Sequence, residues 1–447
     1  MKKYVIIIIS IVVLLLVASY FVWSLLLRHA GLTLPDYDAA IVSKNDRVYS
    51  QPDYSAAGEN IRKNSQWRGD NRDGVYGETG LLKRWPADGP KLLWKYEGLG
   101  HGYTSAAIAN GKIYITGLTG DILMLYVFDL KSGRLLRQKG VGRERDSQYP
   151  GPRSTVCVND GKLYIYNALG MLYCLDEVTL DEVWRKHLFM DFDGKGIMWG
   201  VTESPLIVDD RVFMTPGGDR HNMVAMNKNT GALIWSSTGE GTPSSYCSPQ
   251  FIADQSVPII VTNTREHIIA INADTGEKLW SFPQTNQQNI HPNTPLYSDG
   301  MIFSTTGYKG GSMLLRLKDG GKSAEQVWKN DEADTQIGGA VKAGDYIYAS
   351  GHQNKYWFCM DWKTGETMYK VRDMAPCNVI YADGMLYCYS EKGTMNLVNP
   401  SPEKFEPVSS FKVTPGTDQH WAHPVIHGGV LYLRHGDALM AYDISIE

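Results

Sequence analysis

A short unit that occurs three times constrains the fold of this chain more than any other feature. In residues 270–280 it consists of an apolar stretch, a Thr-Gly turn and a second stretch that ends with Trp280. It recurs in residues 225–235 with Trp235, and in residues 359–369 with Tyr in place of Trp. The glycine suits a turn with positive φ, and tryptophan has the bulk to fill the space between two packed sheets. The recurrence predicts a repeat architecture.

A second marker, a hairpin turn rich in Asp and Gly followed by a strand that ends in Tyr or Phe, accompanies this unit. The fourth copy is diverged, and the copies lie at residues 110–114, 160–164, 210–213, 251–261, 299–303, 344–348, 383–387 and 428–432. Their spacing of roughly 40–50 residues is the length of one four-stranded blade of a propeller. In the first repeat, Leu136 takes the place of the tryptophan.

The eighth repeat is short, because after residues 438–442 the chain ends at Glu447 without a fourth strand. A spare strand with Trp94 lies before the first repeat, in residues 91–97. Pairing it with the last blade leaves no exposed strand edge at the closure of the ring. We therefore predict an all-β fold for residues 66–447, an eight-bladed β-propeller of four-stranded antiparallel blades.

The N-terminus predicts a membrane anchor. Residues 4–27 are mostly apolar and carry no charge, which is enough to cross a bilayer as one transmembrane helix. The apolar run continues past Ala18 and Ser19, so we expect an uncleaved signal anchor. With Lys2 in a cytoplasmic stub of residues 1–3, the propeller is expected on the periplasmic side of the inner membrane, after a tether of residues 28–65.

Composition limits the classes of partner and cofactor that the chain is expected to bind. The formal net charge of −4 and the lack of a basic stretch argue against nucleic acid. The six cysteines form no C-x-x-C pair, and Cys157, Cys174 and Cys388 fall in apolar strands. We expect buried free thiols there. No metal site is predicted.

Residues 67–74 (WRGDNRDG) and 89–94 (GPKLLW), together with the Thr-Gly…Trp units and the eightfold count, resemble the PQQ-binding-like β-propeller repeat proteins. PQQ is pyrroloquinoline quinone. The resemblance extends from about residue 67 to the C-terminus. Its superfamily includes quinoprotein alcohol dehydrogenases. It also includes the non-enzymatic propeller subunit of the outer-membrane β-barrel assembly machinery.

The dehydrogenase features implied by this resemblance are incomplete. A vicinal cysteine pair and a C-x-x-C-H haem motif do not occur in the sequence. A Ca²⁺ site needs several oxygen ligands, and only Glu203 and Asn293 fall at suitable places, without a third carboxylate beside them. We therefore predict no cofactor, with PQQ and Ca²⁺ as the alternative. The assembly subunit is a lipoprotein, whereas this chain has no cysteine before Cys157.

In a propeller the innermost strand of each blade lines the central channel, and ligands bind where these strands begin. Polar and aromatic residues cluster at these starts, which we call the blade mouths. We expect them to converge on a funnel formed by Tyr103, Arg153, Glu203, Tyr246, His291, Asn293, Trp421 and His423. Such a set can bind a carboxylate or sugar through Arg and stack rings on Trp or Tyr. Glu203 beside a His could act as an acid–base pair, and polar channel walls are the alternative.

Three functions remain open from the sequence. The leading hypothesis is a membrane-anchored, non-catalytic binding or scaffold protein of the cell envelope, which binds an envelope protein or polymer at the propeller face. The second is a quinoprotein-type oxidoreductase, similar to PQQ-dependent alcohol or polyvinyl-alcohol dehydrogenases. The third is an enzyme that acts on polysaccharide with funnel residues. We assign no catalytic residue.

Overall fold

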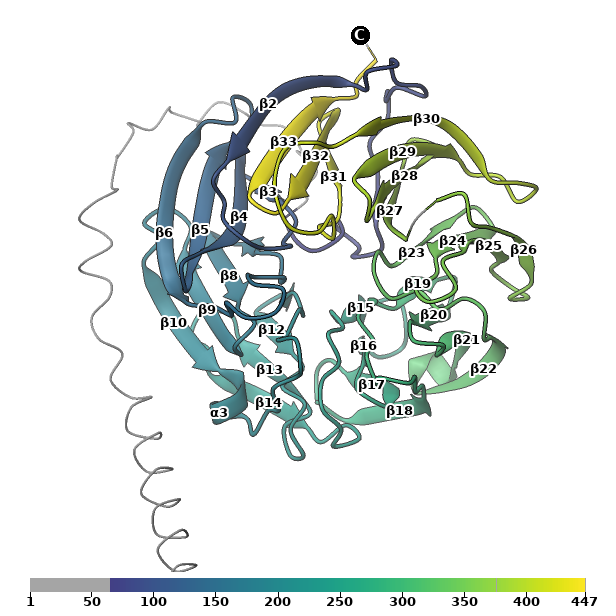
Figure 1. Cartoon of the computed structure of the whole chain (residues 1–447). Helices are drawn as coiled ribbons and strands as arrows, with labels where there is room; N and C mark the ends of the chain where they lie inside the picture. Colours follow the sequence, from purple (N-terminus) through teal and green to yellow (C-terminus); the bar gives the residue numbers. More distant parts are fainter. Residues whose placement is uncertain (1–64, 375, 447) are drawn as a thin grey trace, which may run out of the picture. The chain divides into compact units, whose positions relative to one another are not determined.

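Eight antiparallel sheets follow one another around a ring (Figure 1). The computed structural model describes residues 65–374 and 376–446. The predicted anchor, and all of the tether except its last residue, lie outside this range. Within it, no helix is long and apolar enough to span a membrane. The prediction of an eight-bladed all-β propeller is confirmed.

Each blade has four strands, numbered from the channel outwards. The first four blades are β3 (Ala107–Ala109), β4 (Lys112–Thr119), β5 (Ile122–Asp129), β6 (Leu135–Arg143); β7 (Cys157–Asn159), β8 (Lys162–Tyr166), β9 (Met171–Asp176), β10 (Glu182–His187); β11 (Leu206–Val208), β12 (Arg211–Met214), β13 (Met223–Asn227), β14 (Leu233–Ser237); and β15 (Gln250–Ile252), β16 (Ile259–Asn263), β17 (His267–Asn272), β18 (Lys278–Pro283). A short helix, α3 (Leu188–Asp191), follows β10.

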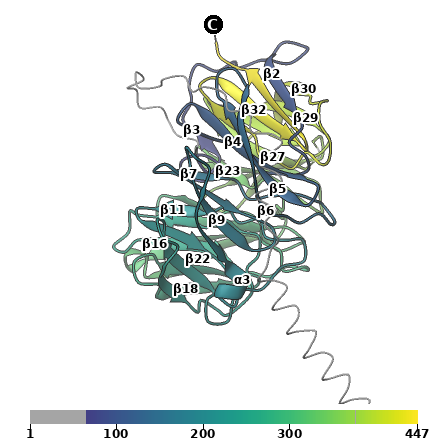
Figure 2. The ribbon, with the colours of Figure 1, turned by 90° about the vertical axis from the view of Figure 1, so that its left-hand side faces the viewer.

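The next three blades repeat this order. They are β19 (Leu296–Ser298), β20 (Met301–Thr306), β21 (Gly311–Lys318), β22 (Ser323–Asn330); β23 (Ala340–Ala343), β24 (Tyr346–Ser350), β25 (Trp357–Asp361), β26 (Thr367–Val371); and β27 (Cys377–Ala382), β28 (Met385–Ser390), β29 (Thr394–Asn399), β30 (Glu406–Lys412). A 3-10 turn, η1 (Asp319–Gly321), joins β21 to β22. Figure 2 shows from the side how the strands of neighbouring blades tilt against one another.

The eighth blade closes the ring with a strand from the other end of the domain. It consists of β31 (Val425–His427), β32 (Val430–His435), β33 (Ala438–Asp443) and β2 (Lys91–Glu97). β2 runs antiparallel to β33 and places Trp94 opposite Ala441. The first blade therefore joins the last through chain that precedes it, and no outer strand is missing.

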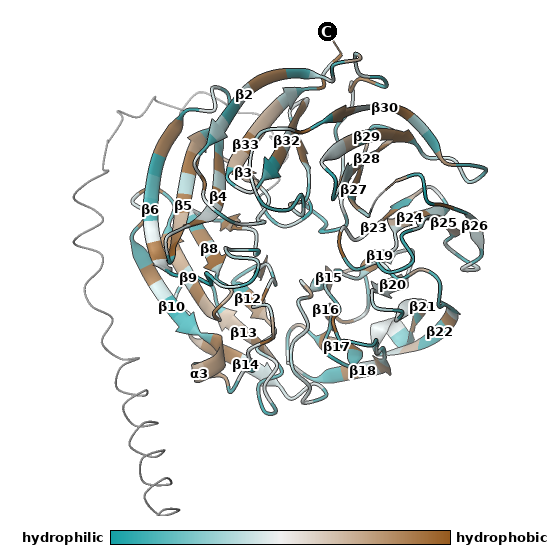
Figure 3. Ribbon diagram, in the orientation of Figure 1, coloured by the Kyte–Doolittle hydropathy of each residue, from teal (hydrophilic) through white to brown (hydrophobic). Residues whose placement is uncertain are grey.

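Apolar side chains fill the spaces between neighbouring blades. One buried cluster combines Ile113 and Phe128 of the first blade with Leu433 and Met440 of the eighth. Outer strands such as β6 and β30 carry both hydrophobic and hydrophilic residues along their length (Figure 3) and are only partly buried. The core is thus a series of interfaces between sheets around the channel.

The recurring tryptophan connects one blade to the next. Trp235 of the third blade donates its indole N–H to the carbonyl of Ala273 in the fourth, at 2.9 Å. A Cβ added at Gly276 would lie 2.8 Å from the Trp235 ring, so this turn needs glycine for contact as well as for its φ of +78°. Trp94 packs in the same way on Gly133, across the closure of the ring.

A β-bulge precedes the equivalent outer-strand residue in every blade. In the fourth blade the register shifts between Ala270 and Ile271, opposite Trp280. Bulges also occur between β5 and β6, β9 and β10, β13 and β14, β21 and β22, β25 and β26, β29 and β30, and β33 and β2. Because a bulge re-aims the neighbouring side chain, it turns the tryptophan towards the next blade.

The first blade departs from the prediction at this position. Arg137, not Leu136, stands at the tryptophan position, opposite Val127. Its guanidinium donates to the carbonyls of Val178 and Thr179 in the turn of the second blade. That turn has Leu180, with φ of +64°, at the place that glycine takes in the turns of Gly231 and Gly276.

Residues 65–76 cross the inner side of the ring, and we call them the plug. β1 (Val75–Tyr76) pairs in parallel with β27, the innermost strand of the seventh blade. Arg72 donates to the carbonyls of Ser204 and Pro205, at 2.7 and 3.0 Å, at the mouth of the third blade. The plug therefore binds blades on different sides of the channel, a role that the sequence did not reveal.

We expect Gly276→Ala to destabilise the protein more than Gly300→Ala. Both glycines have positive φ, +78° and +71°, and alanine in that conformation costs about 1–2 kcal/mol. Only at Gly276 does the new Cβ also collide with Trp235, which adds about 1–3 kcal/mol of overpacking. The measurement is the urea midpoint of the purified full chain. Equal losses in the two variants would contradict the role of the tryptophan contact.

Candidate functional site

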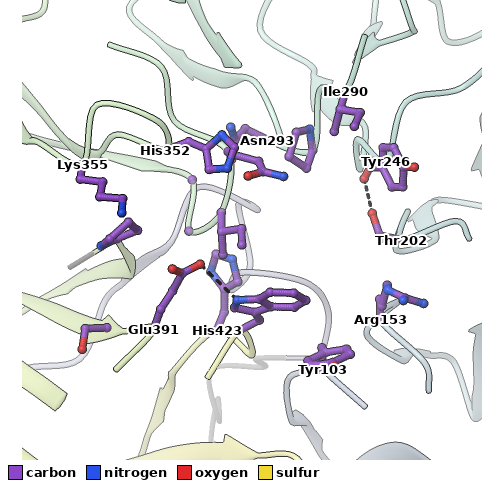
Figure 4. Close-up of a pocket in the computed structure, with 18 of the residues that line it drawn as sticks. Tyr103, Arg153, Thr202, Tyr246, Ile290, Asn293, His352, Lys355, Glu391 and His423 are labelled. Atoms are coloured by element: carbon purple, nitrogen blue, oxygen red, sulfur yellow. Dashed lines mark hydrogen bonds between the residues drawn. The ribbon is translucent and has the colours of Figure 1, made fainter. Parts of the chain in front are cut away.

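The blade mouths and the plug surround a cavity of about 920 Å³. Six of the eight predicted funnel residues line it, namely Tyr103, Arg153, Tyr246, Asn293, Trp421 and His423. Figure 4 shows five of these side chains under their labels, around one open space. The mouths converge because the innermost strands of all blades begin at the same end of the ring.

Aromatic side chains form one wall of the cavity. The ring of Trp421 lies 5.1 Å from the ring of Tyr103 and 5.1 Å from that of Tyr149, with interplanar angles of 39° and 53°. Further along, Trp199 lies 6.3 Å from Tyr246, at 39°. With one more ring from the fifth blade, the aromatic wall consists of Tyr103, Tyr149, Trp199, Tyr246, Tyr308 and Trp421.

Hydrogen bonds hold the polar atoms of this wall. Tyr103 donates from Oη to Gln419 Oε1 at 2.7 Å, and Trp421 donates from Nε1 to Glu391 Oε1 at 3.1 Å. Burial raises the pKa of Tyr103 to about 12, so its hydroxyl keeps its proton at neutral pH. The orientations of the Tyr103 and Trp421 rings are therefore fixed, and the Tyr103 hydroxyl does not act as a base at neutral pH.

Arg153 lies beside the aromatic wall without a carboxylate partner among the described residues. Its guanidinium donates to the carbonyls of Gly151 and Tyr149, and its Cζ lies 5.8 Å from the centre of the Tyr103 ring. Burial lowers the pKa of Arg153, and the nearby Glu144 opposes this shift. Arginine in this setting can bind a carboxylate of a ligand.

The plug contributes two residues that the sequence did not assign to the site. Trp67 donates from Nε1 to Thr294 Oγ1 at 3.1 Å, and its ring lies 4.5 Å from that of His423. Arg68 donates to the carbonyls of Gly338 and Ala340 and approaches His423 Nδ1 at 3.4 Å. Burial and then the charge of Arg68 keep the pKa of His423 well below its usual value, so the imidazole is neutral. The repeat-free segment before β2 gave no sign of this placement.

Asn293 joins two neighbouring blades at the cavity. Its Nδ2 donates to the carbonyl of Thr335 at 2.6 Å and to that of Thr305 at 3.2 Å. The amide is thus engaged in holding the mouths of the fifth and sixth blades together. Its side chain is buried, and it lines the cavity at the mouth of the fifth blade.

Glu203 and His291, the predicted acid–base candidates, do not line the cavity. The Glu203 carboxylate accepts hydrogen bonds from the backbone N–H of Thr215 at 3.0 and 3.1 Å and from its hydroxyl at 3.1 Å. His291 is fully buried, with Nε2 3.1 Å from the carbonyl of Arg265. Burial lowers the pKa of His291 to about 4. Each side chain is engaged within the structure, and the two do not form a pair at the cavity.

Loops beyond the blade mouths add charged residues to the rim of the cavity. Lys355 comes from the loop between β24 and β25, and Lys392 from the loop between β28 and β29. Arg372, Asp373, Glu391 and Lys412 lie in the same region of the sixth and seventh blades. These residues were missed because the prediction considered only the starts of innermost strands.

The side chains present do not fit a Ca²⁺–PQQ centre. Ca²⁺ requires about six to eight oxygen ligands, whereas Glu203 is bound to Thr215 and Asn293 presents its amide to carbonyls. Within the described residues, no group of three or more His, Cys, Asp or Glu side chains is placed to hold a metal ion. The six cysteines are free and buried, which confirms the predicted thiols of Cys157, Cys174 and Cys388.

We expect Glu203→Gln to change the pH dependence of stability. Burial raises the pKa of Glu203 from its ordinary range to about 8, although Thr215 and Arg72 oppose the shift. The folded state therefore holds this proton more tightly than the unfolded state, and stability is lost as pH rises from about 4.5 towards 8. Glutamine resembles the protonated form and removes this loss, on the order of a few kcal/mol.

Urea unfolding of the full chain at several pH values between 5 and 9 measures this effect. Glu277→Gln, at an exposed position in the turn before β18, is the matched control. The stability of the wild type relative to Glu203→Gln should fall with rising pH, whereas its stability relative to the control should stay level. A constant difference for both variants would contradict a raised pKa at Glu203.

Comparisons with known proteins agree with this fold. A family model described as "Outer membrane protein assembly factor BamB" matches residues 124–250 and 218–401. No curated protein matches the chain significantly.

Solved structures of several proteins share the fold. BamB from Moraxella catarrhalis is similar with a TM-score of 0.58 and 13% identity, over 79% of this chain and 99% of that one. Quinohemoprotein alcohol dehydrogenase from Comamonas testosteroni has a TM-score of 0.64 and 12% identity, over 86% and 80%. A europium-containing methanol dehydrogenase has a TM-score of 0.57 and 13% identity, over 83% and 90%. At these identities the likeness concerns the fold alone, and the family match, which covers more than half of the chain, shows that this protein belongs to the BamB-like PQQ β-propeller family.

Proposed function

We propose that this protein is a non-catalytic binding and scaffold protein of the cell envelope. In this proposal residues 4–27 anchor it in the inner membrane by a single pass, and the propeller lies on the periplasmic side. Its cavity and the surrounding blade mouths bind the partner. The proposal follows from the site, because a propeller fold by itself does not determine function.

The position of the titratable groups carries the proposal. Two of the rings that line the cavity, Tyr103 and Trp421, already donate their polar hydrogens to neighbouring side chains. Glu203 and His291, the predicted acid and base, are buried outside it, and Glu391, which does line it, accepts a hydrogen bond from Trp421. A general acid or base must reach the reacting group within hydrogen-bond distance. This arrangement favours binding over catalysis.

The family adds support for a protein partner. The matching model is named for an outer membrane protein assembly factor, and BamB from Moraxella catarrhalis aligns over nearly its whole length. We extend to this chain only the idea that a propeller of this family binds an envelope component through its loops. The exposed ring of Tyr149 and the half-buried ring of Trp199 offer contact surface at the rim.

We expect the purified full chain to bind no stoichiometric PQQ in the presence of Ca²⁺ and to show no dye-linked alcohol oxidation. The physical reason is the lack of gathered oxygen ligands around Glu203 and Asn293. Absorbance titration and a dye-linked assay measure the two quantities. Stoichiometric cofactor uptake with turnover would establish the quinoprotein alternative instead.

Site-specific crosslinking provides the positive half of the same test. A photoreactive amino acid in place of Tyr149 stands at the rim of the cavity, and the same group in place of Val183 stands on β10, an outer strand. Both positions are exposed, so reactivity alone does not separate them. Crosslinks to one envelope component from position 149 but not from position 183 support a binding site at the cavity. Equal labelling from both positions contradicts it.

A further inference from the structure

Positive side chains gather in the cavity of an otherwise acidic chain. Six cationic residues line it, Arg68, Arg153, Lys355, Arg372, Lys392 and Lys412, against the two carboxylates of Asp373 and Glu391. The whole chain has a formal net charge of −4. A cavity lined by one sign of charge focuses the electric field and raises the local concentration of ligands of the opposite sign.

None of these six cations forms an ion pair with another described residue, whereas many cations elsewhere do. Lys278 and Lys370, for example, each lie 2.7 Å from a glutamate. In contrast, Lys412 donates only to the carbonyl of Lys392, at 3.1 Å. Convergent cations that outnumber the carboxylates in a concave site are arranged for an anionic ligand.

These charges stand on two sides of the cavity. Lys355, Arg372, Lys392 and Lys412 come from the sixth and seventh blades. Arg153 comes from the chain between the first and second blades, beside Tyr103. Figure 4 shows Lys355 and Arg153 at opposite sides, with Glu391 and His423 between them. A ligand that reaches both sides needs more than one anionic group along its length.

The aromatic wall restricts the shape of the ligand further. Its rings come from several blades and meet at angles of 39° to 53°. A single planar ring system is held best between two parallel rings, and these pairs are tilted and already in contact. Tyr103 and Tyr246 are buried, whereas Tyr149, Trp199, Tyr308 and Trp421 keep part of their rings exposed. Separate exposed rings of this kind suit a chain of small rings. Sugar rings meet this requirement, since their C–H faces pack on Trp and Tyr.

We infer that the cavity binds an acidic oligosaccharide, a chain of sugar rings that carry carboxylate groups. The sugar rings lie along the aromatic wall, and the carboxylates meet Arg153 on one side and the lysines and arginine of the sixth and seventh blades on the other. This inference rests on the proposed non-catalytic function and names the ligand class of the same site. A neutral glycan lacks the charges, and an acidic peptide lacks the row of rings.

Short oligogalacturonate is the probe, and its methyl ester is the matched control with the same rings and no charge. Calorimetric titration uses the purified full chain in a non-ionic detergent. We expect the acid to bind, the ester to bind at least about tenfold more weakly, and affinity for the acid to fall with added salt. Polyglutamate, which has charge without sugar rings, should bind more weakly than the acid.

Variants locate the site. Lys355→Gln with Lys392→Gln removes two cavity charges and should weaken binding of the acid about tenfold or more. The control pair, Lys278→Gln with Lys329→Gln, removes two lysine charges that are paired outside the cavity and should leave affinity unchanged. Tyr149→Ala should weaken binding several-fold, and Tyr149→Phe, which keeps the ring, should restore it.

The outcomes separate this inference from the proposed function. Equal affinity for acid and ester, stronger binding of polyglutamate, or no binding of the acid each overturns the acidic oligosaccharide, while the crosslinking result can still stand. Loss of affinity in the control pair to the same extent overturns the placement in the cavity. If the acid binds and new reducing ends appear with time, the ligand class holds and the non-catalytic function fails.

Discussion

The fold depends on a recurring contact, in which an outer-strand side chain of one blade reaches the turn of the next blade. Trp184, Trp235 and Trp328 each pack on a glycine of that turn, and a backbone carbonyl accepts the indole N–H, as for Trp235 and Ala273. The contact removes a large apolar surface from water and leaves no buried donor unpaired. Because Trp94 makes the same packing contact with Gly133 across the closure, the first and last blades are held like any other pair. The mouths are thereby set at fixed positions before any ligand arrives.

The plug binds backbone groups that the ring leaves without strand partners at the channel. Innermost strands have a free edge, and their carbonyls at the channel lack strand partners. Arg72 binds two of them at the third blade and Arg68 two at the sixth, while β1 pairs with β27 at the seventh. Both guanidinium groups are buried, and backbone carbonyls accept most of their hydrogen bonds. The same segment also places Trp67 in the cavity wall. The plug therefore both binds the innermost strands and forms part of the site.

The fold was largely predictable from the sequence because its signal is local. A turn glycine and a tryptophan lie within a few residues of each other and recur, and the missing outer strand of the last repeat pointed to residues 91–97. The site was less predictable, since blade mouths are irregular segments without a period. Thr202 lines the cavity, whereas the adjacent Glu203 does not. Adjacent residues of an extended chain point in opposite directions, so an error of one residue changes a ligand contact into a core residue. The plug and the rim lysines carry no repeat signal at all.

The electrostatic character of the cavity follows from this construction. The buried arginines of the plug donate hydrogen bonds mainly to backbone carbonyls, and Arg68 brings a positive charge to the cavity wall. The rim adds Lys355 and Lys392 from surface loops, which tolerate sequence change better than the strands that they connect. Glu391, one of the two rim carboxylates, accepts a hydrogen bond from Trp421. The charge that selects the ligand is therefore separate from the contacts that hold the blades together, and it can change while the tryptophan contacts and the plug remain the same.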